Sequence, residues 1–520
     1  MSAPWDETYD VVVVGGGGGG LTAAYTAGMA GLRTVVLEKA DVFGGMTAYA
    51  GACLWLPGNH ITAQAAEGDS VEGALAYMRA TVGDPALEDR QRAYVSTSAE
   101  LVEFLTRDPA IRFTYTPFPD YYDAPGRVPN GRGITPQKVP ATELGDLVDL
   151  VRPTQAADRL GRAVRRRTLH GGQALIGRLL LAISRLEAVE ARPAAPFESL
   201  VTSDGQVTGV TALRGGQRSR IGARRGVLLA AGGFEANAGL RRAWQGRDAH
   251  WTNAPATHTG DAILAAASLG ARLAGLENGW WATNLVYPGA AHPGPAETSA
   301  FVVGFRGGLF VNGTGRRFAN ESLPYARMGM EIIALERAGQ PALPIWWIFD
   351  DRFPTVPAIP AAEPDRAAAL AAGLWHSAQT IEELAARLGL PARDLAATVA
   401  RFNSFAATGT DEDFHRGEDE YDRFFSPGAG PNPCLVPVDQ PPYHAVRLEL
   451  GDLGTKGGVV TDADARVLDE AGAPIGGLYA TGNTTASVTG AVYPGPGAPI
   501  GTSMVFGYRA VRHMAAGATG

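Results

Sequence analysis

Apolar residues gather in one long stretch near the start of the chain. Val11–Leu32 reads VVVVGGGGGGLTAAYTAGMAGL and has no charged residue. Its length would allow a membrane span, but glycine interrupts helices and adds almost no hydrophobicity, so the six consecutive glycines argue against one. The pattern instead predicts a buried β-strand before the glycines and an alanine-rich helix over Leu21–Ala30 after them.

A second apolar run after this helix completes a βαβ unit. Arg33–Leu37 is expected to form a strand, and Glu38 follows it. Gly15, Gly17 and Gly20 satisfy the GxGxxG spacing, which allows a tight turn, a close backbone approach to pyrophosphate and close packing of helix on strand. Phosphate would bind N–H groups at the helix start, and Glu38 suits ribose hydroxyls. The unit predicts dinucleotide contacts at Gly15, Gly17, Gly18, Gly20, Glu38 and Lys39.

Three later segments resemble the FAD-binding domain of flavoproteins with two dinucleotide folds. They are FGGMTA at 43–48, RGVLLAAGGFEAN at 225–237 and GGLYATGNTTASVTG at 476–490. Asn483 stands where many such proteins carry an acid, but an amide oxygen also accepts a hydrogen bond from a hydroxyl. The resemblance implies FAD as the cofactor. It adds the following predicted cofactor contacts: Gly45, Met46, Thr47, Ala231, Gly232, Gly482, Asn483 and Ile500.

The length of 520 residues is too great for one hydrophobic core. The early and late FAD segments must meet in space, which places a further domain between them. We predict an α/β fold, in which a two-dinucleotide-binding, Rossmann-type FAD domain carries an inserted α+β catalytic domain. The expected parts are residues 1–280, 281–450 for the insert, and 451–520. We expect a helix to begin at His258–Asp261, and helices in the insert at Leu323–Ala338, Thr380–Leu388 and Ala392–Ala406.

Charge and cysteine content exclude several classes of protein. The net charge of −8 makes nucleic acid and anionic lipid poor partners. Cys53 and Cys434 are too few for a disulfide framework, a haem attachment motif or a zinc cluster, and no histidine spacing suggests a metal site. The acidic amino terminus lacks the features of a signal peptide. We therefore expect a cytoplasmic protein without metal or integral membrane segment, and leave peripheral membrane contact open.

Three tyrosine-bearing stretches carry the candidate chemistry: FPDYY at 118–122, NESLPY at 320–325 and YPGPG at 493–497. Taken singly, tyrosines are usually packing residues and YPGPG is usually a rigid turn. Together with FHRGEDEYDRFF at 414–425, they resemble the 3-ketosteroid Δ1-dehydrogenases, within the wider group of flavoproteins that includes soluble fumarate reductases. The resemblance covers nearly the whole chain.

The resemblance implies a reaction and a role for each tyrosine. A C1–C2 double bond forms beside a ketone when a proton leaves C2 and a hydride leaves C1 for FAD N5. Tyr325 corresponds to the base, and Tyr121 to the hydroxyl that lowers its pKa. Tyr122 is the alternative to Tyr121, which is chosen by motif position alone. Tyr493 and the Gly497 N–H correspond to the donors that stabilise the enolate oxygen.

The same resemblance implies a steroid substrate and an external electron acceptor, a quinone or a similar molecule. The substrate pocket is expected to be apolar, with Phe118 and Pro499 as wall residues and Trp55 as a weaker candidate. A helix expected to start near Gly501 would direct its positive end toward the flavin pyrimidine ring.

Three alternatives stay open at this point. A fumarate-type enoate reductase is favoured by Arg316 and Arg317 just before NESLPY, but LGTKGG at 453–458 lacks the histidine that clamps dicarboxylates in such enzymes. A 3-ketosteroid Δ4-(5α)-dehydrogenase shares much of the pattern. A flavin-binding scaffold or electron carrier would have no use for the tyrosines.

Overall fold

The computed structural model describes residues 4–65, 68–159, 161, 167–248, 251–286, 297–299, 307–352, 366–424, 426 and 428–517. Its first sheet forms around the first predicted strand. β1 (Glu7–Val14) pairs in parallel with β2 (Thr34–Leu37) and with β11 (Gln217–Leu229). β11 then pairs with β21 (Pro474–Ala480), and β2 pairs with β8 (Val189–Arg192). The sheet therefore joins early, middle and late segments of the chain.

Antiparallel strands extend this sheet to eight strands. β20 (Arg466–Leu468) pairs with β21, and β10 (Gln206–Arg214) pairs with β11 and with β9 (Phe197–Ser203). The parallel strands end on the same side, so the loops after β1, β11 and β21 meet there. In open parallel sheets such loops form the binding crevice.

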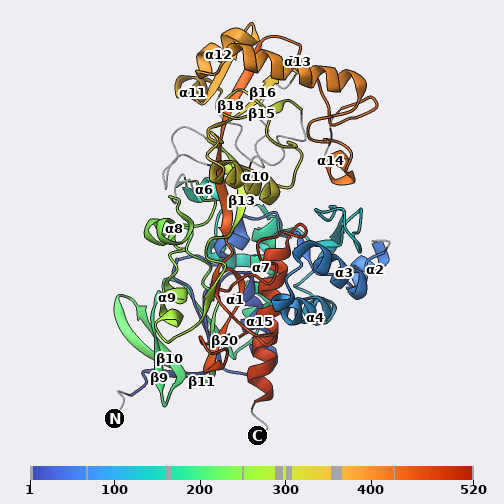
Figure 1. Ribbon diagram of the computed structural model, residues 1–520. Coiled ribbons are helices and arrows are strands. Elements are labelled where there is room, and N and C mark those ends of the chain that lie inside the picture. Colours follow the sequence, from blue (N-terminus) through green and yellow to red (C-terminus); the bar gives the residue numbers. More distant parts are fainter. Residues whose placement is uncertain are drawn as a thin grey trace.

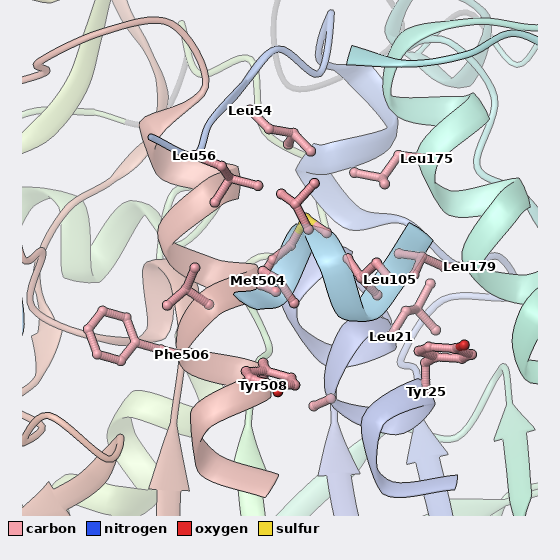
Figure 2. Close-up of a cluster of buried hydrophobic side chains, with 14 of the residues drawn as sticks. Leu21, Tyr25, Leu54, Leu56, Leu105, Leu175, Leu179, Met504, Phe506 and Tyr508 are labelled. Carbon is pink, nitrogen blue, oxygen red and sulfur yellow. The ribbon is translucent and has the colours of Figure 1, made fainter. Parts of the chain in front are cut away.

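Four helices share one apolar core. They are α1 (Gly18–Met29), α4 (Glu88–Thr106), α7 (Gly171–Ile183) and α15 (Ala498–Ala516). Figure 2 shows Leu21, Leu105, Leu179 and Met504 of these helices meeting in this core. The helices α1 and α15 cross closely because glycines face each other: a Cβ on Gly507 would lie 2.5 Å from the Gly19 carbonyl oxygen.

A second sheet of six antiparallel strands lies in the upper part of Figure 1, and the long strand β18 runs from it toward the first sheet. Its order is β14-β13-β18-β16-β15, with β17 also on β18. The strand bounds are β13 (Gly279–Val286), β14 (Glu297–Ser299), β15 (Leu309–Val311), β16 (Ile345–Asp350), β17 (Trp375–Ala378) and β18 (Tyr443–Thr455). The predicted mixed α/β fold is confirmed, and the division at 280 and 450 stays a prediction.

The helices predicted in the insert are present with adjusted bounds. α10 spans Tyr325–Arg337, because Pro324 occupies the N-cap and the helix begins after it. α12 spans Ile381–Leu388 behind the capping side chain of Thr380. α13 spans Ala392–Thr408 and ends at Gly409, which adopts a left-handed φ of 81°.

Two helices begin earlier than the sequence pattern suggests. α1 begins at Gly18 rather than Leu21, since glycines 18–20 are helical where α15 packs against them. α15 begins at Ala498 rather than near Gly501, because Gly497, with a φ of 86°, already forms the N-cap. The apolar stretch that had the length of a span is therefore a strand, a glycine turn and a 12-residue helix.

The remaining elements are β3 (Leu54–Trp55), α2 (His60–Ala65), α3 (Val71–Val82), β4 (Phe113–Thr116), β5 (Gly133–Pro136), β6 (Val139–Pro140), α5 (Ala141–Leu144), α6 (Gln155–Arg159), β7 (Thr168–Leu169), α8 (Ala238–Gln245), α9 (Asp261–Ala267), β12 (Leu273–Ala274), α11 (Arg366–Ala371), α14 (Glu420–Phe424) and β19 (Gly458–Val459). The helix expected after His258 is α9. Within the described ranges, no helix has the length and apolar character needed to cross a membrane.

Candidate active site

The glycine turn after β1 leaves room for a side chain at Gly17 but not at Gly15 or Gly20. A Cβ on Gly15 would lie 2.3 Å from the Ala230 carbonyl oxygen, and one on Gly20 would lie 2.0 Å from the Gly15 oxygen. A Cβ on Gly17 would meet only the Gly44 oxygen within 4 Å, at 3.9 Å. The backbone at Gly17, the N-cap of α1, therefore faces open space. Such a cradle fits a pyrophosphate at a helix start.

The segment at 43–48 runs beside this turn. The Gly44 N–H donates to the Gly16 carbonyl oxygen at 2.8 Å, and the Gly18 N–H donates to Thr47 Oγ1 at 3.3 Å. Glu38 Oε2 accepts from the Gly16 N–H at 2.8 Å, which holds the carboxylate at the end of β2 against the glycines. The structure thus brings the first two predicted cofactor segments together.

The later segments reach the same place. A Cβ on Gly15 would lie 2.8 Å from Ala231 Cα, and one on Gly18 would lie 3.6 Å from Ile500 Cγ2. Ser503 of α15 would touch a Cβ on either Gly19 or Gly482. These contacts converge on the carboxyl end of β1, which agrees with the predicted FAD segments.

The remaining predicted cofactor residues also have neighbours within the protein. The Lys39 ammonium is exposed and pairs with Asp261 at 2.8 Å, so any contact of Lys39 with FAD stays a prediction. Asn483 Oδ1 accepts from Trp280 Nε1 at 3.1 Å, and its Nδ2 donates to Glu235 Oε1 at 3.3 Å. Gly232 has a left-handed φ of 76° beside the His258 ring. Gly45 and Met46 lie in the turn of 3₁₀ helix at Gly45–Tyr49.

Three tyrosines from distant parts of the chain form one buried cluster. The ring centroids of Tyr121 and Tyr325 are 6.0 Å apart, those of Tyr121 and Tyr493 are 5.2 Å apart, and those of Tyr325 and Tyr493 are 5.4 Å apart. The Tyr121 hydroxyl donates to the Tyr325 hydroxyl at 3.3 Å. The side chains predicted from three separate motifs therefore meet.

The loop YPGPG places an amide beside the Tyr493 hydroxyl. The Gly497 N–H donates to Tyr493 Oη at 3.3 Å. A Cβ on Gly497 would lie 1.7 Å from the Cys53 carbonyl oxygen, so this position requires glycine. The Tyr121 N–H donates to the Pro494 carbonyl oxygen at 3.1 Å, which ties this loop to the Tyr121 segment.

Burial and hydrogen bonding act on the Tyr325 phenol in opposite directions. Burial raises its pKa and the hydrogen bonds from Tyr121 and Tyr493 lower it in part, and together they leave the pKa at about 12. Burial also holds the pKa values of Tyr121 and Tyr493 well above their usual range, so both stay proton donors. Tyr325 is thus the most acidic phenol of the three.

The other predicted residues lie around this cluster. The Phe118 ring packs edge-on against Tyr121, and Pro499 lies in the first turn of α15, two residues after Gly497. Trp55 is fully buried and donates from Nε1 to Asp120 Oδ1 at 2.7 Å, so the structure places it in the core. Tyr122 lies beside the cluster: Arg327 lies over its ring, and the Tyr493 backbone hydrogen-bonds to its hydroxyl.

Two aromatic neighbours were not singled out from the sequence. The Tyr421 ring lies 5.2 Å from Tyr121, and the Trp280 ring lies 4.8 Å from Tyr493. Tyr421 belongs to FHRGEDEYDRFF, so that motif was the available signal. No sequence motif pointed to Trp280 as an active-site residue, and it stands one residue before the predicted insert.

A buried ion-pair cluster supports the Tyr121 segment. Arg132 is completely buried and binds Asp120 at 2.8 Å and Asp69 at 3.1 Å. Asp120 directly precedes Tyr121, and its Oδ2 also accepts from the Val128 N–H. The cluster therefore fixes the backbone that carries the hydroxyl donor to Tyr325.

Replacing Arg132 by Met is expected to destabilise the protein by about 3–5 kcal/mol, because two buried carboxylates lose their partner. The measurement is the shift of the urea unfolding midpoint relative to the unsubstituted protein. Arg107→Met serves as the control, since Arg107 makes an exposed pair with Glu103 and should change little. Equal midpoints for the two variants would contradict the expectation.

Arg316 and Arg317, the residues that favoured a fumarate-type site, form ion pairs with carboxylates of this chain. Arg317 is buried and binds Glu321 and Asp411, each at 2.7 Å. Arg316 is exposed and binds Asp394 at 2.9 Å. Neither guanidinium points into the tyrosine cluster as a carboxylate clamp, so the described geometry gives a dicarboxylate site no support from these residues.

The glycine cradle, the converging cofactor segments and the buried tyrosines define an FAD-dependent oxidoreductase. The family model "FAD binding domain" matches residues 10–500. The chain belongs to this family and, within it, to the 3-oxosteroid 1-dehydrogenases. It is 39% identical to 3-oxosteroid 1-dehydrogenase of Rhodococcus opacus, with 98% of this chain and 99% of that protein covered. The enzyme of Mycobacterium tuberculosis is 36% identical, with 98% of each chain covered.

Solved structures and one further relative refine this placement. The 3-ketosteroid Δ1-dehydrogenase of Sterolibacterium denitrificans, solved with 1,4-androstadiene-3,17-dione, matches with a TM-score of 0.90 at 35% identity, covering 98% of this chain and all of that one. The Δ4-(5α)-dehydrogenase of Rhodococcus jostii matches with a TM-score of 0.71 at 25% identity, covering 99% and 98%. The 4-oxocyclohexanecarboxylate 2-dehydrogenase of Sinomonas cyclohexanicum is 37% identical, covering 99% and 94%.

Proposed function

We propose that this chain introduces the C1–C2 double bond into the A-ring of 3-ketosteroids. The observation that carries the proposal is the meeting of Tyr121, Tyr325 and Tyr493 with the Gly497 N–H in one buried cluster. Two of these groups can donate to a ketone oxygen while a third faces the carbon beside it. The greater similarity to Δ1 than to Δ4 enzymes supports the C1–C2 position.

The proton step belongs to Tyr325. Its phenolic oxygen takes the C2 proton, while the Tyr493 hydroxyl and the Gly497 N–H donate to the ketone oxygen as negative charge develops there. The Tyr121 hydroxyl donates to Tyr325 and stabilises its phenolate form. Bound FAD supplies the acceptor for the hydride that leaves C1.

The glycine turn and its neighbours are proposed to hold the FAD. Gly17 and the start of α1 face the pyrophosphate, Glu38 the ribose hydroxyls, and Asn483 the ribityl chain. The amino end of α15, which carries the positive partial charge of the helix dipole, would point toward the flavin pyrimidine ring. Phe118 and Pro499 are proposed as walls of the steroid pocket. The external acceptor, a quinone or a similar molecule, and the cytoplasmic location stay predictions.

The rate is expected to rise with pH between about pH 7 and about pH 10. The base works deprotonated, and its pKa of about 12 lies above this range. The deprotonated fraction of Tyr325 therefore grows about tenfold for each pH unit. The measurement is kcat/KM with an artificial electron acceptor, after a check that the protein recovers full activity when returned to pH 8. A maximum below pH 7 would contradict Tyr325 as the base.

An anaerobic titration tests the function itself. Addition of androst-4-ene-3,17-dione should bleach the yellow flavin absorbance, and NMR of the product should locate the new double bond at C1–C2. A product unsaturated at another position would overturn the proposed regiochemistry. Bleaching by 4-oxocyclohexanecarboxylate but not by the steroid would overturn the substrate class. Reoxidation of chemically reduced protein by fumarate would favour a reductase.

A further inference from the structure

A second feature of the cofactor region is a small pocket with two basic side chains, Lys456 and Arg90, on its wall. Its lining includes Lys456, Arg90, Trp280 and Thr502, together with the predicted cofactor residues Gly482 and Asn483. Thr502 lies in the early part of α15, whose amino end also carries positive charge. The pocket therefore adjoins the proposed flavin position. The charged side chains that line it, Lys456 and Arg90, are both basic.

Lys456 is held firmly inside this pocket. It is 2% exposed, and its ammonium lies 4.0 Å from the centroid of the Trp280 ring. The ammonium donates to the carbonyl oxygen of Val492, the residue before Tyr493. Its position is thus fixed both by an aromatic face and by the loop that carries an active-site donor.

The structure gives this ammonium no negative partner. Among the described residues, no carboxylate forms an ion pair with Lys456 or with Arg90, which donates to the Ala486 carbonyl oxygen at 2.8 Å. Burial lowers the pKa of Lys456 well below its usual range and that of Arg90 to about 10, and Asp462 offsets the effect on Arg90 in part. A buried cation of this kind favours an anion in its pocket.

We propose that Lys456 stabilises the negative charge of the reduced flavin and so raises the reduction potential of the cofactor. A neutral flavin that accepts a hydride gains one proton and two electrons, and therefore one negative charge. The Lys456 ammonium, with Arg90 on the same pocket wall, offsets that charge. The role is electrostatic and requires a cation at position 456, not a lysine as such.

This inference depends on bound FAD but not on the steroid substrate. Sulfite adds to flavin N5 and gives an anionic adduct, so its affinity reports positive charge near the ring without any turnover. The test compares sulfite binding, followed by flavin absorbance, and the midpoint potential, measured against reference dyes. The proteins are the holoenzyme and its Lys456→Met, Lys456→Arg and Lys138→Met variants, in which Lys138 is an exposed control.

Lys456→Met is expected to weaken sulfite binding about tenfold or more. For a two-electron couple, a tenfold loss in the equilibrium constant for flavin reduction corresponds to a fall of about 30 mV in the midpoint potential. Lys456→Arg should stay within about threefold of the unsubstituted holoenzyme, and Lys138→Met should not change. Unaltered sulfite affinity and potential in Lys456→Met would overturn the proposal.

The same set of variants tests the proposal even if Lys456→Met loses its FAD. If Lys456→Met does not retain FAD, Lys456→Gln is measured in its place. Loss of FAD from both neutral variants but not from Lys456→Arg supports a requirement for charge. Loss of FAD from all three overturns the proposal, because the position would then serve packing. Bleaching by a steroid is a separate outcome, so this failure and that of the proposed function are distinguishable.

Discussion

Tyr325→Phe is expected to lower kcat by about 10²–10⁴-fold, the range that a general base contributes. The substitution removes the oxygen that would accept the C2 proton but keeps the ring that packs against Tyr121 and Tyr493. The flavin absorbance of the purified variant should therefore equal that of the unsubstituted protein. The measurement is the single-turnover rate of flavin bleaching under anaerobic conditions, which excludes effects on the external acceptor.

The control for this variant is Tyr115→Phe. The Tyr115 hydroxyl donates to the Asn130 carbonyl oxygen, outside the tyrosine cluster, and the rate should stay unchanged. Near-normal turnover of Tyr325→Phe would refute the role of Tyr325. An equal loss in both variants would point instead to a general effect on folding.

Tyr493→Phe is the second substitution with a large expected effect. It removes one of two donors to the developing enolate oxygen, and loss of one such donor costs about 2.7–4 kcal/mol of transition-state stabilisation in other enzymes. The expected fall in kcat is therefore about 10²–10³-fold. The Gly497 N–H is retained, so activity should not disappear.

The matched control is Tyr508→Phe, also near the carboxyl end of the chain. The Tyr508 hydroxyl donates to Glu100 at 2.7 Å, away from Tyr493. A loss of less than about tenfold in Tyr493→Phe would show that another group polarises the ketone. A kinetic isotope effect on the bleaching rate, with substrate deuterated at C2, would then identify whether proton removal still limits the reaction.

Much of the cofactor region could be predicted because its signals are local. One βαβ unit contains the apolar run before Gly15, the glycines and Glu38. Each of these features depends on the conformation of the backbone within that unit. The start of α1 was placed three residues too late, because the helical state of Gly18 depends on the packing of α15. That contact joins residues from opposite ends of the chain.

The choice between Tyr121 and Tyr122 shows where sequence reasoning ends. Both residues stand in the same motif, and only the structure shows that it is the Tyr121 hydroxyl that donates to the Tyr325 hydroxyl, at 3.3 Å. The sequence suggested that hydrogen bonding would lower the pKa of Tyr325. In the structure burial outweighs that effect and raises the pKa to about 12. Burial depends on segments that motif spacing cannot place.

By itself, the sequence determined the glycine turn, the parallel strands, the FAD cofactor and the family, since hydrophobic period and motif order act over short stretches of chain. The tertiary structure alone decided the burial and the hydrogen bonds of the three tyrosines, the pairing of Arg317 with Glu321 and Asp411, and the burial of Lys456 without a carboxylate partner among the described residues. These outcomes depend on packing between segments far apart in sequence, and desolvation, which sets the charges of the site, exists only once that packing has formed.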